Sequence, residues 1–172
     1  MAGVYLIEKG GNLVELQERP YNAEAELQEL LARYPSLLPG DQVNAAEPRR
    51  WLLIAREVGL ASEEDGSNRW SVDHLFVDQD GVPTIVEVKR SNDTRIRREV
   101  VGQMLDYAAN GVKYWPVQTL QSQFEARCKN QKPPVDPAER LEDFLATSEE
   151  EGDRIDAFWL KVKDNLQLGG SA

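Results

Sequence analysis

The sequence predicts a mixed α/β (α+β) fold: a helix, a three-strand antiparallel meander and a second helix, followed by a C-terminal helical appendage. Two observations support this prediction. Residues 70–78 and 82–89 are rich in strand-forming residues and are separated by a short turn, and helical patterns lie on both sides of them. The chain has 172 residues, of which 41% are hydrophobic, so it can bury one sizeable core.

The N-terminal third is predicted to contain a hairpin, a helix and a strand. Two short apolar runs flank Gly10-Gly11, which predicts a small hairpin within residues 4–16. Asn22 can cap a helix over residues 22–34, and a proline follows directly after it. Residues 51–58 are apolar and favour a strand, with a helix as the alternative left open.

Helices are expected from residue 94 onward. Asp93 or Ser91 can cap a helix over residues 94–110, and Gly111 can end it. Beyond Pro116, apolar residues recur at helical spacing in three further stretches, around Leu120–Cys128, Leu141–Leu145 and Ile155–Leu166.

The turn Gln79-Asp80-Gly81 allows two registers for the strands beside it. A two-residue loop places Asp73 opposite Val86, on the sheet face away from Glu87. A three-residue loop with a left-handed glycine places Asp73 directly opposite Glu87. The position of Gly81 favours the three-residue loop.

In that register Asp73, Glu87 and Lys89 form a polar cluster among apolar neighbours. Like charges directly opposed destabilise a sheet, and a bound divalent cation would remove this penalty. The simpler alternative is a surface hairpin that carries an ordinary Glu–Lys pair.

The helix predicted next to this hairpin also places polar groups toward the sheet. Ile96, Val100, Gln103 and Tyr107 fall on one helical stripe. A glutamine on a buried stripe needs a partner, either nearby backbone or the carboxylate cluster. The second alternative makes Gln103 and Tyr107 substrate-facing or supporting groups.

Positive charge is concentrated in the same region. Five cations and one acid lie between residues 89 and 98, in a chain of net charge −10. A basic rim around an acidic pocket suits an enzyme that acts on a phosphate backbone, although a solvated helix face would have the same composition.

The spaced set Asp73, Glu87-Val88-Lys89 and Gln103 to Tyr107 resembles the PD-(D/E)XK nuclease superfamily, and its Q-x-x-x-Y element resembles the RecB-like branch. The resemblance covers roughly residues 20–110 and implies a restriction-endonuclease-like core. Residues 22–38 resemble the upstream helix of these proteins, in which Glu24 is the matching glutamate.

The resemblance also implies roles for these residues. Asp73, Glu87 and the Val88 carbonyl would bind Mg²⁺ or Mn²⁺, and Lys89 would orient or deprotonate the attacking water. Glu24 would hold a metal-bound water or a second ion. Gln103 and Tyr107 would hold substrate or position Lys89. Nucleic acid, with DNA preferred, would contact the basic residues Arg90, Arg95, Arg97 and Arg98.

The chain departs from the family pattern in two places. Val72 replaces the proline that often precedes the aspartate, a position that varies across the superfamily. The core should also continue with a strand after the second helix, and only Val112–Val117 could supply it, with Pro116 unfavourable. This departure predicts an edge covered by a helix or a second copy of the chain, or a chain that is part of a longer protein.

The remaining expectations concern domains, location and the alternative function. Residues 1–117 are predicted to form the nuclease-like domain and residues 118–172 the helical appendage. The single cysteine, Cys128, fits a reducing cytoplasm, and we see neither a signal peptide nor a membrane span. The single histidine, His74, should pack on the sheet face opposite Asp73. The competing function is a catalytically unused nuclease-like fold that serves as a nucleic-acid-binding or protein-assembly module.

Overall fold

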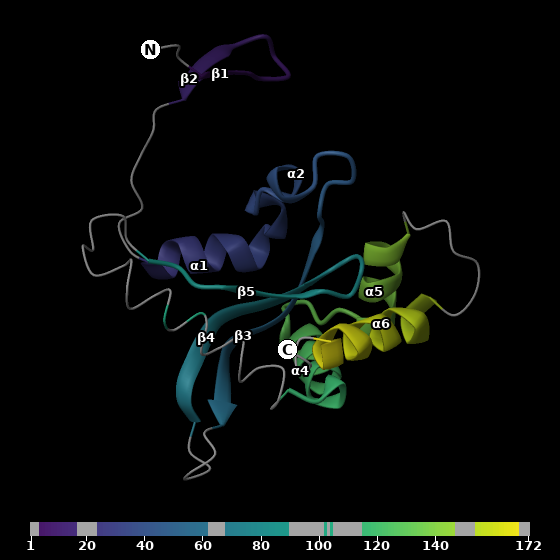
Figure 1. The fold of residues 1–172 in the computed structure, drawn as a ribbon. Coiled ribbons are helices and arrows are strands. Elements are labelled where there is room, and N and C mark those ends of the chain that lie inside the picture. The colour runs from purple at the N-terminus through teal and green to yellow at the C-terminus, as the bar shows by residue number, and fades with distance from the viewer. Residues whose placement is uncertain are drawn as a thin grey trace.

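A computed structural model describes residues 4–16, 24–61, 68–89, 102, 104, 115–146 and 154–168, without the side chains of 4, 58–61, 68–70 and 168. It is a mixed α/β fold, as predicted (Figure 1). The elements that follow the chain are β1 (Val4–Ile7), β2 (Leu13–Leu16), α1 (Glu24–Arg33), the 3₁₀ helix η1 (Pro35–Leu37), α2 (Gly40–Val43), β3 (Trp51–Ala61), β4 (Asn68–Asp78), β5 (Pro83–Val86), α4 (Val117–Asn130), α5 (Pro137–Leu145) and α6 (Arg154–Leu168).

The strands β3, β4 and β5 form an antiparallel sheet with β4 in the centre. This confirms the predicted meander and decides for a strand over residues 51–58. Leu53 pairs with Phe76 and Ala55 pairs with Leu75, so Ile54 is an extra residue in β3. Such a bulge bends its strand and increases the local twist. Ile54 is nevertheless fully buried in the core.

The turn between β4 and β5 has three residues, as the position of Gly81 predicts. Asp78 pairs with Val82 through a backbone hydrogen bond of 3.1 Å, and Gly81 has φ of 77°. The buried Asp78 carboxylate accepts hydrogen bonds from the backbone N–H groups of Asp80 and Val82, at 3.0 and 2.9 Å. Arg49 forms ion pairs with both Asp78 and Asp80. These contacts fix the turn and therefore the register of the strands.

The two faces of β4 carry different partners. The Nε2 atom of His74 lies 2.8 Å from the backbone oxygen of Gln28 in α1, and its ring stacks on Phe76. Leu75 and Val77, which alternate with these residues, belong instead to a core cluster shared with α4, α5 and α6. The α1 helix and the α4–α6 group accordingly lie on different sides of the sheet in Figure 1. The predicted placement of His74 on the face opposite Asp73 is confirmed.

The C-terminal helices α4, α5 and α6 contribute aromatic side chains to this core. The ring of Trp159 lies near those of Phe124 and Phe158, with centroids 6.1 and 5.3 Å apart. The N-cap of α5 is Asp136, whose side chain accepts two backbone hydrogen bonds. Because one cluster contains residues from both sides of position 117, these helices are integral to the core. The division into domains at that position stays a prediction.

The α6 helix also packs on the turn between β4 and β5. The Asn165 side chain donates a hydrogen bond of 3.1 Å to the Asp80 carbonyl. A Cβ atom added to Gly81 would lie 2.8 Å from the backbone nitrogen of Val162. The helix predicted around Ile155–Leu166 is therefore seated beside β5 and its turn.

The predicted strand over Val112–Val117 is wrong at its C-terminal end. Trp115 and Pro116 are not in a strand, and Val117 is the first residue of α4. Proline fixes φ and has no N–H to donate, so Pro116 suits the N-cap of a helix better than a strand interior. Residues 112–114 lie outside the described residues.

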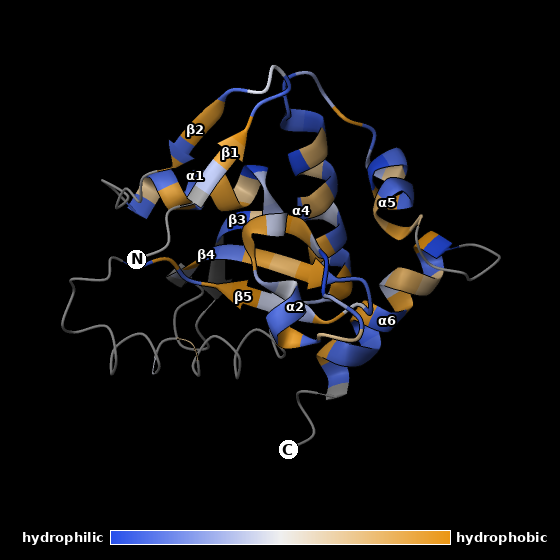
Figure 2. Cartoon of the chain, turned by 90° about the horizontal axis from the view of Figure 1, so that it is seen from above, coloured by the Kyte–Doolittle hydropathy of each residue, from blue (hydrophilic) through white to orange (hydrophobic). Residues whose placement is uncertain are grey.

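The N-terminal hairpin is formed by β1 and β2, as predicted. Gly11 has φ of 81° and donates a hydrogen bond of 2.8 Å to the Glu8 carbonyl in the connecting turn. Much of both strands is hydrophobic (Figure 2). Large apolar side chains are nevertheless 39% to 72% exposed there, those of Tyr5, Leu6, Ile7, Leu13, Val14 and Leu16.

Candidate active site

Asp73 and Glu87 face each other across β4 and β5. The pairs from Val77↔Pro83 to His74↔Val86 lead directly to Asp73 and Glu87 as the next opposed residues. The Asp73 Oδ2 atom accepts a hydrogen bond of 2.8 Å from the Val88 backbone N–H. The Asp73 N–H donates to Glu87 Oε2 over 3.5 Å. The register required by the sequence argument is therefore confirmed.

The hydrogen bond from the Val88 N–H to Asp73 explains why β5 ends before the predicted boundary at residue 89. Asp78 and Val82 form a hydrogen-bonded pair, so Val72 and Val88 would be bonded in the same way if the ladder continued. The Val88 N–H is instead directed to the Asp73 side chain, and β5 stops at Val86. The carboxylate replaces a backbone partner at this point.

Lys89 completes what we term the carboxylate–lysine cluster, which consists of Asp73, Glu87 and Lys89. Its Nζ atom lies 2.7 Å from Glu87 Oε1, and the Glu87 side chain is only 4% exposed. The hydrogen bond to Glu87 raises the pKa of Lys89 above its ordinary value, against a lowering by desolvation. Nearby negative charges raise it further, those of Glu87, Asp73 and Glu24. Lys89 is therefore a cation at neutral pH, which favours charge stabilisation and orientation over proton abstraction.

Glu24 is the first residue of α1 and is half-buried. Its negative charge contributes to the raised pKa of Lys89, so it acts on the same cluster from a different element. The structure thus brings Asp73, Glu87 and Lys89 into contact. Glu24 is linked to them only through the effect of its charge on Lys89.

The donor chemistry of this cluster fits a hard divalent cation such as Mg²⁺ or Mn²⁺, because carboxylate and carbonyl oxygens are their usual protein ligands. Glu87 is nearly buried and Asp73 is half-buried, so neither carboxylate is fully hydrated. Among the described residues, no group of three or more His, Cys, Asp or Glu side chains is arranged to hold a metal ion.

Glu57 is a site neighbour that the sequence argument missed. In β3, Arg56 pairs with His74 and Val58 pairs with Val72, so Glu57 lies at the level of Asp73. Its φ of 51° is in the left-handed region, which costs a non-glycine residue roughly 1–3 kcal/mol. Asp73 therefore has an acidic residue at its level on each side, Glu57 in β3 and Glu87 directly after β5. The only sequence signal was the charged pair Arg56-Glu57 inside an apolar strand.

The other predicted site residues lie outside the described residues. These are Gln103, Tyr107, Arg90, Arg95, Arg97 and Arg98. Gly102 and Met104 are described and helical, and Met104 packs partly buried against the core cluster. The roles of the undescribed residues stay predictions.

Two further observations bear on what the chain is. No helix among the described ranges has both the length and the apolar character that crossing a membrane would require. Comparisons of the chain with protein-family models, with curated proteins and with solved structures found no match. The resemblance to a nuclease superfamily therefore stays a prediction that is based on residues and their spacing.

Proposed function

We propose that the protein is a metal-dependent nuclease that hydrolyses phosphodiester bonds in nucleic acid, with DNA as the preferred substrate. The observation that supports this proposal most is the meeting of Asp73 in β4 with Glu87 and Lys89, which directly follow β5. A surface hairpin with an ordinary Glu–Lys pair would not require a nearly buried glutamate opposite a second carboxylate. The burial of Glu87 thus favours a functional cluster over the simpler alternative.

Asp73, Glu87 and the Val88 carbonyl are the groups that would hold Mg²⁺ or Mn²⁺. The metal would supply Lewis-acid stabilisation of phosphate charge and a more acidic bound water. Lys89 would contribute its positive charge beside the phosphate and orient the attacking water. Glu24 would add a negative charge from α1, which helps to retain a cation in the cluster.

The nucleic-acid strand would be held by the basic segment that follows Lys89. Its arginines would neutralise phosphates, so binding should weaken steeply as salt is raised. Gln103 and Tyr107 keep their proposed place next to the substrate or to Lys89. A reducing cytoplasm stays a proposal, in agreement with the single buried cysteine.

The direct test is cleavage of plasmid DNA, single-stranded DNA and RNA in Mg²⁺, Mn²⁺ and EDTA. The variants Asp73→Asn, Glu87→Gln and Lys89→Met should each lose about 100-fold or more, since even contacts one step removed from a metal typically cost 10–100-fold. The asparagine keeps an oxygen that can accept the Val88 N–H.

A matched control lies on α4, where Glu125 and Lys129 form an exposed pair of 3.3 Å. Glu125→Gln and Lys129→Met make the same chemical changes away from the cluster and should leave cleavage within about twofold, as expected for surface substitutions. Cleavage that persists in EDTA, or that survives both Asp73→Asn and Glu87→Gln, would contradict the proposal.

The alternative is a catalytically unused fold that binds nucleic acid or assembles with protein. The exposed apolar side chains of the β1–β2 hairpin favour an assembly role. Single exposed apolar residues are common on protein surfaces, but six of them in two short strands form a patch of the kind that binds a partner. Oligonucleotide or protein binding without cleavage in any metal would support this alternative.

A further inference from the structure

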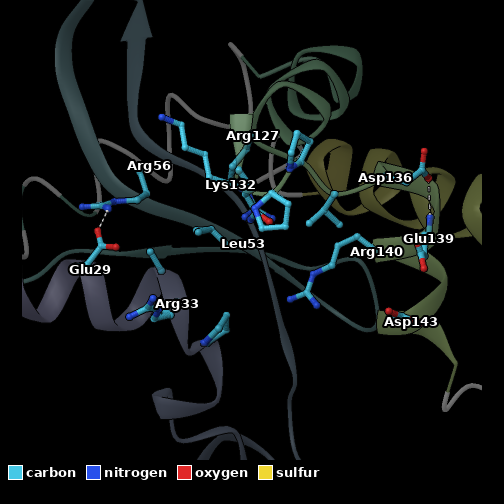
Figure 3. Close-up of a pocket in the computed structure, with 16 residues that line it drawn as sticks. Glu29, Arg33, Leu53, Arg56, Arg127, Lys132, Asp136, Glu139, Arg140 and Asp143 are labelled. Atoms are coloured by element: carbon cyan, nitrogen blue, oxygen red, sulfur yellow. Dashed lines mark hydrogen bonds and ion pairs between the residues drawn. The ribbon is translucent and has the colours of Figure 1, made fainter. Parts of the chain in front are cut away.

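A second candidate site lies away from the carboxylate–lysine cluster. A cavity of about 870 Å³ opens between α1, β3 and the segment from the end of α4 to α5 (Figure 3). We term it the basic cleft because five of its lining residues are cations, namely Arg33, Arg56, Arg127, Lys132 and Arg140. None of them was singled out by the sequence.

The acids of the basic cleft are partly committed elsewhere. Glu29 pairs with Arg56 at 2.6 Å, and the Asp136 carboxylate accepts the backbone N–H groups at the start of α5. For the other two acids of the lining, Glu139 and Asp143, no ion pair is found within the part of the chain that the structure describes. In Figure 3 Asp136 and Glu139 lie at the right edge of the view, while Arg33, Arg127 and Arg140 come from three different helices, α1, α4 and α5.

Four of the cations have no carboxylate partner within the described ranges. No carboxylate oxygen there lies within 4.0 Å of the charged nitrogens of Arg33, Lys132, Arg127 or Arg140. The Nε atom of Arg127 is buried without a hydrogen-bond partner. Burial lowers the pKa of Arg127, and the charge of Arg140 lowers it further. Two guanidinium groups that repel each other across a cavity would be stabilised by an anion between them.

An adjoining hollow of about 490 Å³ shares Arg56, Arg127 and Gln131 with the basic cleft. It is lined by amide side chains, and the buried Oε1 atom of Gln123 has no hydrogen-bond partner. This hollow can receive a neutral hydrogen-bonding group attached to an anion that sits in the cleft.

We propose that the basic cleft binds the phosphate group of a phosphate ester, held by Arg127 and Arg140, with the organic part of the ester in the adjoining hollow. Arginine suits this task because its planar group can donate two parallel hydrogen bonds to phosphate oxygens. The ester is a free nucleotide or a phosphate of a nucleic-acid strand. The proposal does not require nuclease activity, since Asp73 and Glu87 are not among the lining residues.

The test is calorimetric titration and thermal shift in EDTA, with three probes at matched ionic strength. The probes are inorganic phosphate, a nucleoside 5′-monophosphate and a short single-stranded oligonucleotide. We expect the monophosphate to bind more tightly than inorganic phosphate, because only the ester fills the adjoining hollow. Tight binding of the oligonucleotide alone assigns the phosphate to a strand, whereas preference for the monophosphate assigns it to a free nucleotide.

Arg127→Gln and Arg140→Gln should each weaken binding of the preferred probe about tenfold or more. Arg140 is exposed, so its variant keeps the test decisive even where the partly buried Arg127→Gln fails to fold. Lys129→Gln removes an exposed cation from α4 outside the cleft and should change affinity by less than twofold.

Two results would overturn the proposal. The first is the absence of binding of every probe to the wild type at millimolar concentration. The second is binding that Arg140→Gln and Arg127→Gln leave unchanged. The binding assay is performed in EDTA, whereas cleavage needs Mg²⁺ or Mn²⁺, so a failed cleavage assay and a failed binding assay remain distinguishable.

Discussion

Gly81 connects the register of the sheet to the packing of α6, and Gly81→Ala tests both at once. Its φ of 77° is a conformation that alanine adopts only with strain. The added Cβ would also lie 2.8 Å from the Val162 nitrogen, 2.9 Å from Lys161 Cβ and 3.0 Å from the Lys161 carbonyl carbon. Backbone atoms of a packed helix cannot rotate away as a flexible side chain can, so α6 or the turn must move.

The expected loss follows from these two contributions. The left-handed conformation costs alanine about 1–2 kcal/mol. Crowding of a packed site costs typically 1–3 kcal/mol, and the stiffer unfolded alanine chain returns about 0.4–1 kcal/mol. The free energy of unfolding should therefore fall by roughly 1–5 kcal/mol. For a chain of this length each kcal/mol lowers Tm by about 2–4 °C, which predicts a decrease of about 2–18 °C.

Urea and thermal unfolding followed by circular dichroism would measure this loss, and two other glycines supply matched controls. Gly11→Ala shares the positive φ of 81°, but nothing lies within 4 Å of its added Cβ, so it should show only the conformational cost, confined to the hairpin. Gly102→Ala is helical and open to solvent, so it should raise stability by about 0.5–1 kcal/mol.

A Gly81→Ala protein that melts within about 1 °C of the wild type would refute this reasoning. The turn would then not need a left-handed residue, and α6 would not be seated on it. The three-residue register, and with it the opposition of Asp73 and Glu87, would lose its structural basis.

Three further outcomes follow from the structure. Millimolar Mn²⁺ should raise Tm relative to EDTA, by about 2.7 kcal/mol in stability at 100 times Kd, and the rise should vanish in the Asp73→Ala, Glu87→Ala double variant; a rise that persists would place the metal elsewhere. Trp159→Glu inserts a carboxylate into an aromatic cluster and should lower the free energy of unfolding in urea by at least about 3 kcal/mol. Light scattering would check for association, and unchanged stability would mean that α6 does not cover the sheet. Burial lowers the pKa of His74 below its ordinary 6.5, so the unfolded chain takes up a proton at a higher pH than the folded chain does, and stability should fall as pH drops below 6.5. The His74→Phe variant should show a smaller fall. An unchanged pH dependence would show that His74 is not buried as a neutral ring.

The parts of the fold that the sequence predicted well are those that short-range chemistry decides. Gly81 selects one turn, and the turn fixes which residues oppose each other, so Asp73, Glu87 and Lys89 could be placed from a stretch of under 20 residues. The amphipathic stripe around Trp159 likewise identified a buried helix face.

The parts that escaped prediction depend on segments that are distant in the sequence. The early end of β5 results from a side chain on another strand, and the left-handed Glu57 lies in a strand whose pattern looks regular. The basic cleft gathers cations from α1, β3, α5 and the end of α4, and no local pattern marks them. Pro116 is unfavourable inside a strand, and it stands instead at the N-cap of α4.

The bond between Asp73 and the Val88 N–H also links chemistry to the extent of the sheet. The Asp73 carboxylate accepts the Val88 N–H, which would otherwise form the next backbone hydrogen bond between β4 and β5. We expect the Asp73→Val variant to have a longer β5 and a higher stability, because it lacks the acidic group. Within the described residues β5 lies at an edge of the sheet, so such a chain would present a longer row of unpaired backbone groups there, which favours strand-to-strand association. Retaining the aspartate therefore also keeps the edge of the sheet short.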